Sequence, residues 1–124
     1  MTTKTATSPR PSRPPYRPLV YICSPYAGDT ERNTERARAY CRFAVEQGAI
    51  PFAPHLLFPQ FLDDNNIEER SLAMFMNKIL QGKCDEVWVL GRVITKGMKQ
   101  ELDLAYKRKQ SIRFFDADLK EYVE

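Results

Sequence analysis

Short apolar runs alternate along the chain with longer segments of helical periodicity. Four runs have the length and nearly continuous apolar character of strands that a parallel sheet buries on both faces. They cover residues 19–23, 49–53, 85–90 and 111–115. Between the runs, apolar or small residues recur every three to four positions, which predicts helices. These helices cover residues 30–47, 68–81 and 97–109.

This order of elements predicts the fold class. Strands that alternate with helices form a parallel sheet by right-handed crossovers, with helices on both faces. We therefore expect a three-layer α/β sandwich of flavodoxin or Rossmann type, with a mainly parallel sheet of four to five strands. In such folds the ligand binds at the carboxyl ends of the strands.

The helix over residues 68–81 carries a pronounced apolar stripe. Its members are Leu72, Phe75, Met76, Ile79 and Leu80. An apolar stripe of this kind normally faces the core, so we expect it to pack on the sheet. The segment before it, residues 58–70, resembles a mobile lid over a binding site.

The first eighteen residues differ from the rest in composition. They contain five of the nine prolines and four basic residues without an acid. Such a segment cannot bury enough apolar surface to fold, which predicts a disordered Pro/Arg-rich leader at 1–18 and a single domain at 19–124. Without the leader, 15 bases face 16 acids. A nearly neutral domain makes nucleic acid an improbable partner.

Length and cysteine content exclude other classes of protein. The 124 residues are enough for one ordinary domain. The sequence has no apolar run of the roughly 20 residues that span a bilayer, so we expect no membrane association. Three widely spaced cysteines without a CxxC pair, and no signal-peptide pattern, predict a cytoplasmic protein. Asp63 and Asp64 lack convergent ligands, so neither a metal nor another cofactor is expected.

Three loops converge at the predicted ligand-binding edge, and one acidic residue lies beside them. The loops are residues 24–29, 54–58 and 91–97. Glu101 shares a helical stripe with Met98 and Leu102, so it faces the sheet. A carboxylate near a helix start beside such a crevice suits a nucleophile or a general base. Alternatively, Glu101 complements the helix dipole or pairs with Lys107 or Arg108.

Several motifs resemble the nucleoside 2-deoxyribosyltransferase-like superfamily. They are TyrIleCysSerPro at 21–25, Asn33 in the first helix, CysAspGluValTrpValLeuGly at 84–91, and Thr95-x-Gly97-x-x-x-Glu101-x-x-x-Ala105. The resemblance covers residues 19–115. It implies that Glu101 attacks the anomeric carbon of a nucleoside or nucleotide, expels the base, and passes the sugar to water or to another base. A retaining glycosidase uses a carboxylate in the same way.

The resemblance also indicates further site residues. It implies a catalytic role for Asp85, which can equally be a structural cap at the start of its strand. It implies that the first strand and the loop after it line the pocket, and that three other positions contribute. These substrate-binding candidates are Tyr21, Ser24, Pro25, Tyr26, Gly28, Asn33, Asn77 and Gly91. Thr95 and Gly97 precede a helix and suit a sugar oxygen or a phosphate.

One position departs from the family pattern. Eight residues before Asp85 the transferases often carry an aspartate, where this chain has Asn77. Asparagine forms hydrogen bonds but cannot exchange protons. His55, the only histidine, is a candidate to protonate the leaving base instead.

Two functional hypotheses follow from these residues. The first is N-glycosidic bond cleavage or (deoxy)ribosyl transfer on a nucleoside or nucleoside 5′-monophosphate. The second is a non-catalytic nucleotide-binding regulatory module on the same fold. A phosphoribohydrolase reading is disfavoured, because residues 94–101 lack the ProGlyGly-x-GlyThr-x-x-Glu run. Relatives commonly associate, and an exposed Phe114–Phe115 edge strand would favour a homo-oligomer.

Overall fold

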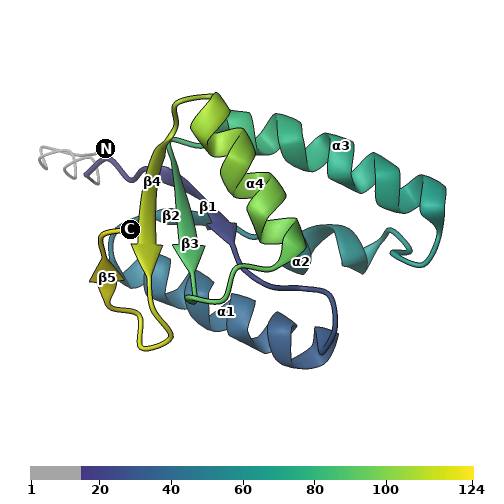
Figure 1. The fold of residues 1–124 in the computed structure, drawn as a ribbon, viewed down its shortest axis with the longest axis horizontal. Helices are drawn as coiled ribbons and strands as arrows, with labels where there is room; N and C mark the ends of the chain where they lie inside the picture. The colour runs from purple at the N-terminus through teal and green to yellow at the C-terminus, as the bar shows by residue number, and fades with distance from the viewer. Residues whose placement is uncertain (1–14) are drawn as a thin grey trace, which may run out of the picture.

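Five strands form one sheet with helices on both faces in the computed structural model, which describes residues 15–124 (Figure 1). The strands are β1 (Leu19–Cys23), β2 (Ile50–Phe52), β3 (Glu86–Leu90), β4 (Ser111–Phe115) and β5 (Glu121–Tyr122). The helices are α1 (Thr30–Glu46), α2 (Pro54–Leu57), the 3-10 helix η1 (Phe58–Gln60), α3 (Ile67–Lys83) and α4 (Lys96–Lys107).

The strand order in the sheet is β2-β1-β3-β4-β5. The first four strands are parallel, and β5 runs antiparallel to β4. The predicted three-layer α/β sandwich with a mainly parallel sheet is confirmed. The carboxyl ends of β1 and β2 therefore lie together at one edge of the sheet, where the candidate loops begin.

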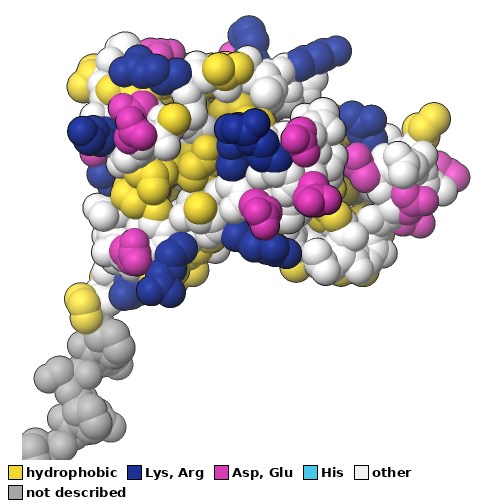
Figure 2. Space-filling model, turned by 90° about the horizontal axis from the view of Figure 1, so that it is seen from below, with side chains coloured by type: hydrophobic (Ala, Val, Ile, Leu, Met, Phe, Trp, Pro, Cys, Tyr) yellow, Lys and Arg dark blue, Asp and Glu magenta, His cyan; other side chains and the backbone are white. Residues whose placement is uncertain are grey.

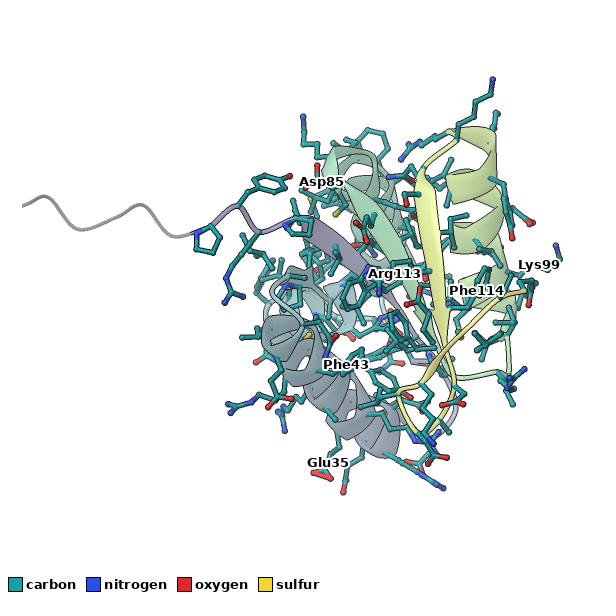
Figure 3. All side chains as sticks on the ribbon, turned by 90° about the vertical axis from the view of Figure 1, so that its left-hand side faces the viewer. Glu35, Phe43, Asp85, Lys99, Arg113 and Phe114 are labelled. Atoms are coloured by element: carbon teal, nitrogen blue, oxygen red, sulfur yellow. The ribbon has the colours of Figure 1, made fainter. Side chains whose placement is uncertain are left out.

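Strand alternation divides the core into two layers. On one face of the sheet, Ile22 and Trp88 pack with α1, and the ring of Trp88 lies 5.0 Å from that of Phe115. On the other face, Tyr21 and Val87 pack with α4. Figure 3 shows Phe43 on the α1 side of the sheet and Phe114 on the α4 side. Successive side chains of a strand point to opposite faces, so each strand serves both layers.

The predicted edge strand at residues 111–115 is not an edge. β5 pairs with β4 through Phe114 opposite Tyr122 and Phe115 opposite Glu121. Both phenylalanines are buried. This corrects the sequence-based argument that an exposed Phe114–Phe115 strand favours self-association.

Helix α3 exists as predicted, but its apolar stripe faces outward. Leu72, Phe75 and Ile79 are 48%, 61% and 46% exposed, and Met76 and Leu80 are half-buried at the side of the stripe. The prediction that this stripe packs on the sheet is therefore wrong. The opposite face of α3 forms a wall of the cavity described below.

Residues 1–14 of the predicted leader at 1–18 lie outside the part of the chain that the structure describes. The residues after it are joined to the domain: the Tyr16 hydroxyl donates to Asp85 Oδ2 over 2.6 Å, and Arg17 donates to the carbonyls of Val45 and Ala49. Pro18 O accepts from the amide of Ile50. The chain thus enters β1 along the amino edge of the sheet.

Figure 2 shows basic and acidic side chains interspersed on one face of the molecule, with apolar side chains between them. This mixture differs from the clustered Lys and Arg of a surface that tracks a nucleic-acid backbone. Among residues 15–124, no helix has the length and apolar character needed to cross a bilayer.

Candidate active site

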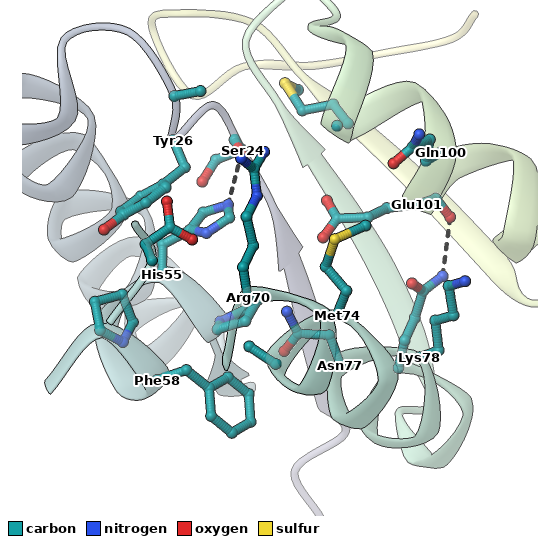
Figure 4. A pocket seen from close by; sticks show the side chains of 18 of the residues that line it. Ser24, Tyr26, His55, Phe58, Arg70, Met74, Asn77, Lys78, Gln100 and Glu101 are labelled. Carbon is teal, nitrogen blue, oxygen red and sulfur yellow. Dashed lines mark hydrogen bonds between the residues drawn. The ribbon is translucent and has the colours of Figure 1, made fainter. Parts of the chain in front are cut away.

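A cavity of about 300 Å³ opens at the carboxyl ends of β1 and β2, between α3 and the start of α4 (Figure 4). The loop after β1 contributes Ser24 and Tyr26, and α2 contributes His55. Thr95 and Gly97 border the cavity at the start of α4. This volume is at the lower end of the range for small-molecule sites. We call this cavity the pocket.

Glu101 brings a carboxyl group into the pocket from α4. Thr95 caps the helix, because its hydroxyl accepts a hydrogen bond from the Met98 amide over 3.2 Å. Glu101 then faces the sheet, as its spacing predicted, and accepts a hydrogen bond from the Tyr21 hydroxyl on β1. The alternative partners of Glu101, Lys107 and Arg108, are not needed to explain this orientation.

The surroundings of Glu101 shift two pKa values. Burial raises the pKa of Glu101 from 4.5 to about 7, while hydrogen bonds from Tyr21 and Cys23 oppose this rise. Burial and the neighbouring carboxyl group raise the pKa of Tyr21 well above 10, so its hydroxyl stays protonated as a donor. Near neutral pH, Glu101 therefore exists in both forms, and the Tyr21 hydrogen bond favours the anionic one.

His55, Tyr26 and Ser24 form the opposite wall. His55 is the second residue of α2, and its ring stacks on Tyr26 with centroids 4.6 Å apart. His55 Nε2 lies 3.1 Å from the carbonyl oxygen of Ser24. A carbonyl only accepts, so Nε2 carries the proton. Burial lowers the pKa of His55, which favours the neutral ring.

Two buried polar atoms of the pocket have no hydrogen-bond partner among the described residues. They are Ser24 Oγ and Asn77 Oδ1. A buried polar atom without a partner costs free energy, which a bound ligand with a suitable donor or acceptor can recover. Both atoms belong to residues predicted to bind substrate, and both residues line the pocket.

Helix α3 supplies pocket residues that the sequence analysis missed. They are Arg70, Ala73, Met74, Lys78 and Gln81, which lie around Asn77. Figure 4 shows the Arg70 side chain extending from α3 toward Ser24. These positions recur every three to four residues, which places them on one face of α3, but the spacing alone does not show that this face borders a pocket.

Several predicted substrate-binding residues do not line the pocket. Pro25 and Gly28 belong to the loop after β1 but do not border it. Asn33 is buried and donates to the carbonyls of Tyr26 and Ala27, so it holds that loop in place. Gly91 adopts a φ of +93°, which glycine tolerates and which turns the chain out of β3. None of these four residues borders the pocket, and Asn33 supports the loop that does.

Asp85 lies at the opposite edge of the sheet from the pocket, immediately before β3. It accepts from the Tyr16 hydroxyl over 2.6 Å and from the Leu19 amide over 2.8 Å, and these bonds lower its pKa. Figure 3 shows it near the entry of the chain into β1. This geometry corrects the assignment of Asp85 to the catalytic residues and favours its alternative role as a structural cap.

Within residues 15–124, no group of three or more His, Cys, Asp or Glu side chains is arranged to hold a metal ion. The polar side chains that line the pocket carry carboxyl, phenol, hydroxyl, imidazole, amide, ammonium and guanidinium groups.

The sequence matches, over residues 18–115, the family described as "Domain of unknown function (DUF7768)". No curated protein matches it. Among solved structures, a 2-deoxyribosyltransferase from Bacillus psychrosaccharolyticus has a TM-score of 0.65 at 16% identity, over 86% of this chain and 77% of that enzyme. A 2-deoxyribosyltransferase from Leishmania mexicana has a TM-score of 0.53 at 14% identity, over 80% of this chain and 64% of that enzyme. The predicted nucleoside 2-deoxyribosyltransferase-like fold is confirmed.

Proposed function

The chain belongs to the DUF7768 family, a domain of unknown function, and we propose that this member cleaves the N-glycosidic bond of a nucleoside or nucleoside 5′-monophosphate. Glu101 is the nucleophile in this proposal. The observation that carries it is the Glu101 carboxyl group, which lies in the pocket and accepts a hydrogen bond from Tyr21. The similarity of the fold to two 2-deoxyribosyltransferases supports the same class of reaction.

The proposed reaction has two steps. A carboxylate oxygen of Glu101 forms a bond to the anomeric carbon of the sugar while the bond from that carbon to the base nitrogen breaks. The departing nitrogen keeps the electron pair and takes up a proton. Water or a second base then attacks the anomeric carbon and loses a proton to solvent, and the bond to Glu101 breaks to restore the carboxylate. With water, the products are free base and free sugar, or sugar phosphate.

The departing base receives its proton from water in this proposal. His55 was the sequence-based candidate for the proton donor. Its Nε2 proton already faces the Ser24 carbonyl, and its lowered pKa favours the uncharged ring. A neutral histidine with an occupied donor is poorly suited to protonate a base at pH 7. We therefore assign His55 a positioning role, in which it holds the Ser24 loop and Tyr26.

Other pocket groups are proposed to orient the substrate. Asn77 Oδ1 has no hydrogen-bond partner among residues 15–124, and it suits an N–H of the base or a hydroxyl of the sugar. The start of α4 at Thr95 and Gly97 suits a sugar oxygen, because helix N-termini present free amides. Arg70 carries a guanidinium that can pair with a 5′-phosphate.

Chromatographic detection of free base tests the proposal. The purified chain is incubated with ribo- and deoxyribonucleosides and their 5′-monophosphates, with and without a second base as acceptor. We expect release or exchange of base by the wild type. Glu101→Gln, which keeps the size of the side chain, should lower turnover by on the order of 10³-fold or more.

Glu31→Gln is the matched control, because it makes the same chemical change at an exposed position on α1. It should leave turnover unchanged. Turnover by Glu101→Gln equal to that of the wild type would exclude Glu101 as nucleophile.

A second candidate function rests on Asn77. An amide at this pocket position cannot exchange protons, which fits a module that binds nucleotides without cleaving them. Calorimetric binding of a nucleotide by the wild type, with no base released over several days, would select this function. Binding should then persist in Glu101→Gln.

A further inference from the structure

Two side chains of β1 lie against Glu101. Tyr21 and Cys23 are two positions apart on the strand, so they point to the same face of the sheet, where α4 packs. Both residues are 0% exposed. Tyr21 lines the pocket, whereas Cys23 does not border it. Cys23 therefore meets Glu101 from beneath the pocket, where a bound substrate does not reach the thiol.

The Cys23 thiol has two acceptors within reach and one hydrogen to donate. Its Sγ donates to the backbone oxygen of Met98, in the first turn of α4, over 3.7 Å. It also forms a hydrogen bond with the Glu101 carboxyl group. A thiol carries a single S–H donor, so it serves these two acceptors in alternation. Burial raises the pKa of Cys23 well above its ordinary value, so the thiol keeps its hydrogen at neutral pH.

The charge on Glu101 determines which acceptor the thiol prefers. A hydrogen bond to an ionised group is about twice as strong as one between neutral groups. The Glu101 carboxylate therefore attracts the thiol hydrogen more strongly than the Met98 carbonyl does. A protonated or esterified Glu101 is neutral and loses this advantage, and the Met98 carbonyl then offers the thiol a partner in the same buried place.

We propose that Cys23 is a positioning residue for Glu101, because its thiol donates to the carboxylate when Glu101 is ionised and to the Met98 carbonyl when Glu101 is neutral. The two donors of β1 then have different roles. Tyr21 donates to Glu101 and holds the carboxyl group in place. Cys23 responds to the charge of that group, and its hydrogen bond is not lost when the charge disappears.

The exchange of acceptors affects the two steps of the reaction differently, and this consequence rests on the proposed function. In the first step, Glu101 bonds to the anomeric carbon and loses its charge, and the base departs with the electron pair. The thiol then donates to Met98 O and keeps its proton. In the second step, water attacks the anomeric carbon and gives a proton to solvent, and Glu101 takes back the electron pair of the broken bond. Donation by Cys23 stabilises the carboxylate as it forms.

The other titratable and charged groups near Glu101 lie around the pocket. They come from α2, α3, the segment before α3 and the start of α4, and they are His55, Asp63, Asp64, Glu69, Arg70, Lys78 and Lys96. The pKa of Glu101 itself is set by burial and by the hydrogen bonds from Tyr21 and Cys23. Removal of the thiol should therefore act on Glu101 directly.

The infrared S–H stretching band tests the donation without any need for turnover. The frequency of this band falls when the thiol donates to a stronger acceptor. The Cys23 band, identified by its loss in Cys23→Ala, should shift to lower frequency as pH rises through about 7, the pKa of Glu101. In Glu101→Gln the band should not move with pH. Cys41→Ala is the matched control, because Cys41 packs on the α1 side of the sheet and its loss should leave the shift intact.

Rapid-quench kinetics at pH 8 separates the two steps, because base release reports the first and sugar release reports the second. Cys23→Ala should leave the first step within about twofold and slow the second about tenfold, as expected for the loss of one hydrogen bond. Cys23→Ser keeps a single donor of similar size and should restore the second step to within about threefold of the wild type. Circular dichroism confirms that each variant remains folded.

The spectroscopic and kinetic results can fail separately. A Cys23 band that does not shift with pH, or that shifts equally in Glu101→Gln, overturns the donation to Glu101. Equal losses in both steps of Cys23→Ala, without recovery in Cys23→Ser, would show that the thiol only fills space. A wild type that shows the band shift but releases no base supports the donation while it excludes the proposed function.

Discussion

Burial and hydrogen bonding have opposite effects on the pKa of Glu101. The hydrogen bond from the Tyr21 hydroxyl can be removed by a single substitution. Burial raises the pKa of Glu101 to about 7, and the Tyr21 hydrogen bond lowers it. Tyr21→Phe keeps the ring and deletes the hydroxyl. The pKa of Glu101 should then rise further, by about one unit for a hydrogen bond to a charged group.

The consequence is a shifted pH profile. A nucleophilic carboxylate must be ionised, so kcat/KM should fall as pH drops below about 7 in the wild type. In Tyr21→Phe this acid limb should move to higher pH by about one unit. Tyr40→Phe is the control, because it deletes a phenol on the other face of the sheet. An unshifted acid limb in Tyr21→Phe would contradict the assignment.

Substitutions of His55 can distinguish a positioning role of this residue from a role as proton donor. The Gln side chain has an N–H donor that can replace His55 Nε2 and bond to the Ser24 carbonyl. His55→Gln should therefore keep kcat within about threefold and keep the shape of the pH profile, whereas His55→Ala should lose about tenfold. A proton-donating His55 would instead give equal, large losses in both variants and remove the alkaline limb of the profile.

Arg70 is the residue proposed to make the pocket prefer a nucleoside 5′-monophosphate to a nucleoside. A guanidinium that pairs with a 5′-phosphate contributes to binding of the nucleotide alone. Arg70→Ala should raise KM for a 5′-monophosphate by about 10- to 100-fold and leave KM for the nucleoside unchanged. Lys99→Ala, on the exposed face of α4, is the control. Equal effects on both substrates would show that Arg70 does not recognise the phosphate.

At the scale of elements, periodicity predicted which segments are regular but not how each one is oriented. β1 and β4 begin and end where predicted, and β3 starts one residue later. α2 and β5 were missed, because four and two residues are too short to show a period. α3 was found but its orientation was reversed. Rotation of a helix about its axis is fixed by its neighbours, and α3 faces a cavity instead of the sheet.

Gln81 links α3 to α4 and to the segment after α4. It is buried, donates to Glu101 O over 2.9 Å, and its own carbonyl accepts from Gln110 over 2.8 Å. Gln81→Leu keeps the bulk and removes the donor, which should lower the free energy of unfolding by about 1–2 kcal/mol. Chemical denaturation measures the change. Asn65→Leu, in the exposed segment before α3, should have a smaller effect, and the reverse order would deny Gln81 this role.

At the scale of the molecule, the candidate site was predicted in part. Glu101 and Tyr21 were found because strand alternation and helical spacing fix the face of each side chain on neighbouring elements. Asp85 was assigned a catalytic role from the family resemblance, although its position at the start of a strand places it at the edge of the sheet away from the carboxyl ends. Arg70 was missed because it depends on the orientation of α3, which no local pattern determines. The parts that the sequence could not supply are those set by tertiary packing.

The raised pKa of Glu101 also links the site to the stability of the whole chain. The folded protein holds the Glu101 proton up to about pH 7, whereas the ordinary carboxyl of the unfolded chain loses it near pH 4.5. Between these values the folded state binds more protons than the unfolded state, so stability falls as pH rises. The cost is complete above about pH 7 and amounts to about 3 kcal/mol.

Glu101→Gln removes the ionisable group and should remove this cost. We expect the variant to be more stable than the wild type at pH 8, by up to about 3 kcal/mol, and the difference between them to shrink as pH falls toward 4.5. Urea denaturation at both pH values measures it, with Glu31→Gln as the control. A difference that does not change with pH would mean that Glu101 is not held at the raised pKa. A difference that does change would show that the fold bears a cost to keep this carboxyl group in the pocket.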